Sequence, residues 1–178
     1  MTAAVASMET PKTLGALPVE ARRVRLRTLT LIRWGAIAGQ AAAILVTHYG
    51  LGFAVPIGAA LLVVAASGLL NMALTLGRPV GARLGERAAV WYLAYDIGQL
   101  AVLLYLTGGL ENPFAFLLLA PVTVSATILS LRSTVGLCLW ALLCVTALAV
   151  WHLALPWSPG GFALPGLYVL GSWIALCL

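Results

Sequence analysis

The fold is decided by apolar runs such as residues 53–76, FAVPIGAALLVVAASGLLNMALTL, which carry no charged side chain. A helix needs about 20 consecutive apolar residues to cross the hydrocarbon core of a bilayer. Runs of similar length lie near 29–48, 88–107, 114–131 and 134–155, and a sixth run begins near Phe162. Inside lipid the backbone finds no water, so only helices and closed barrels are viable, and these runs lack the alternation of barrel strands. We therefore predict an all-α, polytopic transmembrane helical bundle of about six spans.

The composition excludes a water-exposed globular domain. Hydrophobic residues make up 62% of the chain and charged residues only 8%, with a mean hydropathy of +1.06. A soluble surface needs about a quarter of residues charged. The formal net charge of +5 would suit nucleic acid, but the positive residues cluster at span ends and are interpreted as markers of topology.

The arginines predict which connections are cytoplasmic, because arginine resists translocation. All of them fall on one side of the predicted threading: Arg22, Arg23, Arg25, Arg27 and Arg33 precede or open the first span, Arg78, Arg83 and Arg87 separate the second and third, and Arg132 separates the fourth and fifth. The opposite connections, 48–50, 108–113 and 156–161, carry no Lys or Arg. Segment 1–28 is therefore predicted to be cytoplasmic, and 29–178 to be the transmembrane domain with its carboxyl end also cytoplasmic. The last run reaches Leu178 without a charged flank, so we expect a chain cut before a cytosolic region.

Asp96 lies eight or nine residues into the third predicted span, near the middle of the bilayer. An acidic side chain there costs roughly 2.5–3.5 kcal/mol on insertion scales. Helical spacing puts Tyr92, four residues earlier, and Gln99, three residues later, on the same face as a polar relay. Two interpretations stay open, a structural polar knot and a proton-linked or ligand-binding role. Asn71 and Gln40 are candidate partners on other helices.

The outer loop between the third and fourth spans, Gly108-Gly109-Leu110-Glu111-Asn112-Pro113-Phe114, ends one helix and starts the next. Glycine suits the left-handed C-terminal cap, and Asn followed by Pro suits the N-cap and first turn. The backbone N–H groups of residues 114–116 are then predicted to be free. These donors, with Phe114 or Phe116 as a stacking ring and Glu111 as a proton acceptor, would suit a quinone head group. A plain tight turn is the alternative.

The remaining polar and sulfur-containing side chains indicate no metal site and no catalytic centre. Cys138, Cys144 and Cys177 lie in apolar runs without metal-ligand spacing, so they are interpreted as packing residues. His48 and His152 lie on different hairpins and are interpreted as interfacial side chains. No nucleotide-binding or hydrolytic motif is present in the sequence.

Aromatic residues and a proline mark the depth and shape of the spans. Tryptophans near predicted span ends fit the aromatic belts of membrane proteins; they are Trp34, Trp91, Trp151 and Trp157. Pro121 removes a backbone donor within the fourth span and is expected to kink it.

The stretch from Tyr95 to Thr127 resembles the membrane sensor domain of the RegB/PrrB/ActS redox-responsive sensor histidine kinases. That family carries a GGxxNPF heptapeptide in the short outer loop between its third and fourth spans. Residues at the fixed positions of the heptapeptide are Gly108, Gly109, Asn112, Pro113 and Phe114. The resemblance is strongest over 83–132 and elsewhere extends to the six-span layout.

The resemblance implies a quinone sensor in the bacterial inner membrane. Ubiquinone would bind near the heptapeptide and set the autophosphorylation of a cytosolic histidine kinase, which is a homodimer and acts on a response regulator. The sequence carries no phosphoacceptor histidine motif, no ATP-binding glycine boxes and no cytosolic linker cysteine. We therefore expect this chain to detect and transmit, without nucleic acid or metal. The expected quinone site comprises Gly108, Gly109, Glu111, Asn112, Pro113, Phe114 and Phe116.

Three other functions stay open at this point. A small transporter or channel would use Asp96 as its coupling acid and would show internal repeats, of which there is no clear sign. A quinol-oxidising subunit would need a redox cofactor, and no pair of mid-membrane histidines is available to ligate haem. A ligand-free membrane anchor would have a closed loop that admits no ring.

Overall fold

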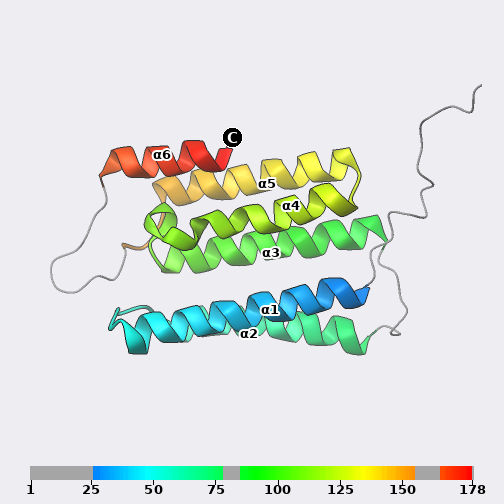
Figure 1. Ribbon diagram of the computed structural model, residues 1–178, viewed down its shortest axis with the longest axis horizontal. Coiled ribbons are helices and arrows are strands. Elements are labelled where there is room, and N and C mark those ends of the chain that lie inside the picture. The colour runs from blue at the N-terminus through cyan, green and yellow to red at the C-terminus, as the bar shows by residue number, and fades with distance from the viewer. Residues whose placement is uncertain (1–25, 78–84, 155–164, 178) are drawn as a thin grey trace, which may run out of the picture.

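The computed structural model describes residues 26–77, 85–154 and 165–177, and every regular element within them is a helix (Figure 1). The α-helices are α1 (Leu26–Leu45), α2 (Ile57–Leu76), α3 (Glu86–Leu106), α4 (Leu119–Ile128), α5 (Leu131–Val150) and α6 (Gly166–Cys177). A π-helical turn, η2 (Val46–Gly50), extends α1, and two 3₁₀ segments, η3 (Gly109–Glu111) and η4 (Pro113–Leu118), connect α3 to α4. The predicted all-α class is confirmed.

Four helical stretches are long and apolar enough to cross a bilayer: Leu29–Gly50, Ile57–Leu76, Glu86–Leu106 and Leu131–Val150. The helical run Pro113–Ile128 is shorter. Its 6 residues of 3₁₀ helix and 10 of α-helix nevertheless rise to roughly 27 Å, close to the ~30 Å of a hydrocarbon core. Helix α6 has 12 residues, and residues 155–164 before it lie outside the described part. The helix lengths thus agree with about six spans.

Two prolines shift helix boundaries away from the predicted ones. The second run was predicted from Phe53, but α2 begins at Ile57 with Pro56 at its N-cap. Proline disfavours helical backbone in the residue before it, here Val55. Pro121 was also expected to kink the fourth span, and this stays a prediction. The α-helical part of that span, α4, begins only at Leu119. Pro121 lies in its first turn, where a missing N–H costs little.

The buried side chains form two clusters that share α3. The larger cluster joins α3, α4 and α5 with the connecting 3₁₀ segments and part of α6, and includes Ile97, Leu118 and Leu137. The smaller cluster joins α1, α2 and α3 through Ile44, Val64 and Leu103. In Figure 1 the pair α1 and α2 accordingly lies on one side of the molecule and α4, α5 and α6 on the other, with α3 between.

The connections alternate between the two ends of the bundle (Figure 1). The starts of α3 and α5 lie at the same end as the start of α1, and Arg87 and Arg132 are exposed there. Segments 46–56 and 107–113 lie at the opposite end. The arginine pattern therefore separates the two ends, as the sequence indicates, while their orientation in a membrane stays a prediction.

The surface is apolar, as expected for helices in lipid. Trp34, Trp91 and Trp151 are 42%, 76% and 72% exposed, and Trp157 lies outside the described residues. The cysteines are free, with Cys144 buried and the other two, Cys138 and Cys177, exposed.

Candidate functional site between α1, α3 and α4

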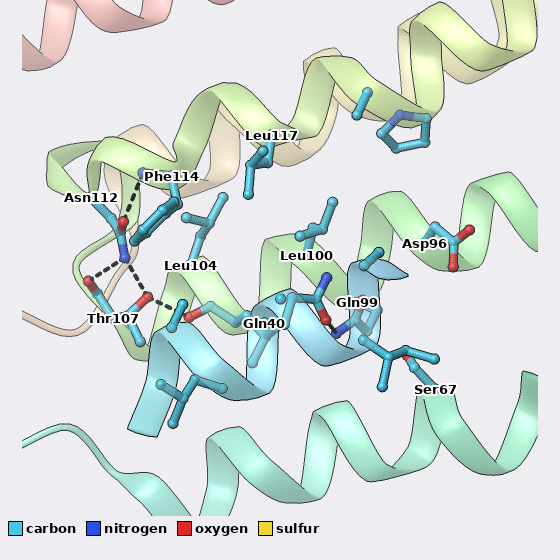
Figure 2. Close-up of a pocket in the computed structure, with 18 of the residues that line it drawn as sticks. Gln40, Ser67, Asp96, Gln99, Leu100, Leu104, Thr107, Asn112, Phe114 and Leu117 are labelled. Carbon is cyan, nitrogen blue, oxygen red and sulfur yellow. Dashed lines mark hydrogen bonds between the residues drawn. The ribbon is translucent and has the colours of Figure 1, made fainter. Parts of the chain in front are cut away.

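A cavity of about 720 Å³ lies between α1, α3 and the η4–α4 segment (Figure 2). Its walls are mostly aliphatic, with α1 contributing one side and α3 the floor. Lining side chains such as Ile32 on α1 and Phe114 and Leu117 on η4 are about half exposed. The cavity therefore reaches the apolar surface between α1 and α4.

An ion pair lies in the half of the cavity farther from the heptapeptide, here called its inner end. Arg33, the eighth residue of α1, places its Nη2 3.0 Å from Oδ1 of Asp96 on α3. Both side chains line the cavity, and they are only 6% and 21% exposed. The expected partners of Asp96, Tyr92 and Gln99, do not bond it among the described residues. Arg33 lies roughly 10 Å along α1 from its first residue, Leu26, and its place on the cytoplasmic side stays a prediction.

Two tyrosine rings surround the Arg33 guanidinium. Its central carbon lies 5.6 Å from the centroid of Tyr92 and 5.8 Å from that of Tyr95. Such cation–π contacts favour the charged side chain when it is desolvated. Tyr92, a member of the predicted polar relay, therefore contacts Arg33 through its ring.

The remaining polar side chains at this level join α1, α2 and α3. Gln99 Nε2 donates to Gln40 Oε1 at 2.9 Å (Figure 2), which links α3 to α1 in the middle of the cavity wall. Asn71 Nδ2 donates to the carbonyl oxygen of Thr30 at 3.2 Å, which links α2 to α1. Gln40 and Asn71, the candidate partners of Asp96, thus bond other groups.

The outer end of the cavity is bounded by Asn112, Pro113 and Phe114. The Asn112 side chain clamps the turn: Oδ1 accepts from the Phe114 N–H at 2.9 Å, and Nδ2 donates to the Thr107 carbonyl and hydroxyl at 3.1 and 2.8 Å (Figure 2). The Ala115 N–H donates to the Asn112 carbonyl at 3.0 Å. The expectation of free donors at Phe114 and Ala115 is therefore wrong, because the N-cap and the 3₁₀ turn use them.

The other heptapeptide residues shape the turn and do not line the cavity. Gly108 and Gly109 both have positive φ, 106° and 57°, in the left-handed region that the predicted cap requires. Gly109 also lies against His152, since an added Cβ would be 2.5 Å from His152 Cγ. Glu111 and Phe116 are not among the described residues that line the cavity, whereas Asn112 and Phe114 are. The expected quinone site is therefore only partly gathered around this cavity.

Arg33 is the residue that the sequence interpretation missed. It is the one arginine placed inside a predicted apolar run rather than before it, beyond Leu29 and among Leu31, Ile32 and Trp34. An arginine at such a position needs a partner inside the bundle. Asp96, the acidic residue in the third predicted span, carries the opposite charge that such an arginine needs.

Comparison with curated proteins finds two relatives that are named sensor histidine kinases. The chain is 44% identical over 155 residues, 86% of its length, to the sensor histidine kinase RegB of Cereibacter sphaeroides. It is also 46% identical over 78 residues to RegB of a named strain of that species. The chain belongs to the RegB family. No family model matches the chain, and no solved structure matches it.

The RegB match covers the site described above. A contiguous match to 86% of the chain necessarily includes α1 to α4 and therefore all of the cavity walls. The chain spans 34% and 17% of the two RegB relatives in these matches, so it corresponds to about a third of a RegB protein. Four of its helical stretches are long and apolar enough to cross a membrane, which indicates a membrane protein.

Proposed function

We propose that this chain is the quinone-sensing transmembrane domain of a RegB-type sensor histidine kinase in the bacterial inner membrane. It crosses the membrane several times and reports the redox state of membrane ubiquinone to the kinase region of the whole protein. That protein works as a homodimer and passes phosphate to a cytosolic response regulator. The curated relatives are named sensor histidine kinases, and the quinone is our inference.

The observation that carries this proposal is the cavity between α1, α3 and α4. Its volume of about 720 Å³ falls within the ~300–1,000 Å³ of small-molecule sites, which are mostly apolar with a few polar groups. A quinone head group is a flat ring with two carbonyl acceptors on an apolar tail. The half-exposed lining side chains at the α1–α4 surface give the tail a path into lipid.

The chemistry of the two redox states supplies the sensing step. The oxidised ring only accepts hydrogen bonds, whereas the quinol also donates two. A ligand shifts a conformational equilibrium only by its differential affinity for the two states, and a tenfold preference supplies about 1.4 kcal/mol. That amount is enough to shift, in a graded way, an equilibrium between two positions of the α1–α2 pair relative to the remaining helices.

The quinone prediction is tested by titrating ubiquinone into the purified chain in lipid nanodiscs, following tryptophan fluorescence. We expect saturable binding, and Phe114→Ala is expected to weaken it about threefold to tenfold, because an aromatic contact contributes ~0.5–1.5 kcal/mol. Phe116→Ala is the matched control, since Phe116 is 47% exposed against 49% for Phe114 but does not line the cavity. Equal losses in both variants would contradict a site at Phe114. Absence of saturable binding would favour the ligand-free anchor.

The orientation of the bundle is a second prediction. The end of the bundle that contains segments 46–56 and 107–113 is expected to lie outside the cytoplasm, since the arginines gather at the other end. A cysteine at Glu111, in a chain whose three native cysteines are replaced, should react with a membrane-impermeant thiol reagent in intact cells. A cysteine at Arg132 should react only after permeabilisation, and the reverse pattern would overturn the topology.

A further inference from the structure

We infer that the head group of the quinone is bound at the inner end of the cavity, where the Arg33 guanidinium donates to a ring carbonyl beside Asp96. This rests on the proposed quinone function and names the residues that carry it. The heptapeptide then forms the outer rim, along which the ring or its tail passes.

The first support is the state of the donors in the cavity. At the outer end, the Asn112 amide N–H groups, the Phe114 N–H and the Thr107 hydroxyl are all used within the turn. An oxidised quinone can only accept hydrogen bonds. The outer rim can therefore contact a quinone through its apolar side chains, but it has few free hydrogen-bond donors.

The second support is the unused donor capacity of Arg33. Its 3.0 Å contact between Nη2 and Asp96 is an ion pair without hydrogen-bond geometry, and among the described residues neither Nη1 nor Nη2 makes a hydrogen bond. The residue is 5% exposed and lines the cavity. A buried polar atom without a partner costs ~1–3 kcal/mol, and more when it is charged. A carbonyl oxygen at the inner end of the cavity would satisfy it.

The third support is that the inner end has groups for both redox states. Arg33 offers only donors, and the Asp96 carboxylate offers only acceptors. A quinone carbonyl is complementary to the first and a quinol hydroxyl to the second. Because Arg33 belongs to α1 and Asp96 to α3, a head group that bonds either side chain would alter an ion pair that connects the α1–α2 pair to the rest of the bundle.

The test compares the wild-type chain with Arg33→Gln/Asp96→Asn in nanodiscs. This double variant removes both charges together and leaves neither one unpaired. We expect its affinity for ubiquinone to fall at least tenfold. Asn71→Ala is the matched control, because Asn71 is fully buried and also bonds α1 but does not line the cavity; it should bind ubiquinone as the wild type does.

The outcomes separate this inference from the proposed function. If the double variant binds ubiquinone like the wild type while Phe114→Ala loses affinity, the head group lies at the heptapeptide and the inference is overturned. If the wild type shows no saturable binding, the proposed function itself fails.

A second measurement on the wild type does not depend on folding of the variant. An azido-ubiquinone with the azide on the ring is photolysed in the nanodiscs, and the adducts are mapped by mass spectrometry. Adducts on 29–40 and 93–100 are expected, and adducts confined to 107–117 would overturn the inference.

Discussion

Replacing Arg33 by alanine is expected to lower the free energy of unfolding by about 3–5 kcal/mol, the cost of leaving one partner of a buried ion pair without the other. The Asp96 carboxylate would keep its burial and lose its counter-ion. The two tyrosine rings that flank the guanidinium would also lose their contact. Equilibrium unfolding of the purified chain in mixed detergent micelles measures this loss.

Two further variants show whether the loss comes from the unpaired charge. Adding Asp96→Asn to Arg33→Ala removes the orphaned carboxylate and is expected to recover part of the stability. Arg87→Ala removes an exposed arginine at the start of α3 and should change stability by no more than ~0.5 kcal/mol. Equal stability of Arg33→Ala and Arg87→Ala would show that the ion pair contributes nothing.

The second large effect is expected for Gly109→Ala. The φ of +57° at Gly109 costs an L-residue roughly 1–2 kcal/mol. The new Cβ would also lie 2.5 Å, 2.7 Å and 2.8 Å from His152 Cγ, Cβ and Nδ1, and such overpacking typically costs about 1–3 kcal/mol more. The His152 ring would have to move, although its Nδ1 is 2.9 Å from the Leu148 carbonyl oxygen. The thermal unfolding midpoint should fall accordingly.

Gly52→Ala separates backbone strain from the clash. Gly52 has a φ of +73° and nothing within 4 Å of an added Cβ, so this variant should lose only the backbone cost. Adding His152→Ala to Gly109→Ala should recover part of the difference, because it removes the contacts with Cγ and Nδ1 but keeps the 2.7 Å contact with Cβ. If Gly109→Ala and Gly52→Ala destabilise the chain equally, the close approach of His152 has no energetic consequence.

The sequence predicted those features of the fold that depend on local rules. Span lengths follow from the apolar runs, helix ends from proline, glycine and asparagine, and the two ends of the bundle from the arginines. Those rules also placed the turn at Gly108 and the N-cap at Asn112, and the heptapeptide gave the family. They did not predict that the fourth helical run starts as a 3₁₀ helix, Pro113–Leu118.

The site itself was decided by tertiary structure. Helices that are apolar all round do not encode which face meets which neighbour, so the sequence could name Asp96 but not its partner. Only the packing of α1 against α3 brings Arg33 to Asp96 and Gln40 to Gln99, and only the separation of α1 from α4 creates the cavity. The sequence determined by itself where helices begin and end to within a few residues, because capping and hydropathy act over short distances along the chain. The pairing of charges between helices depends on their rotation and depth, which the whole bundle sets.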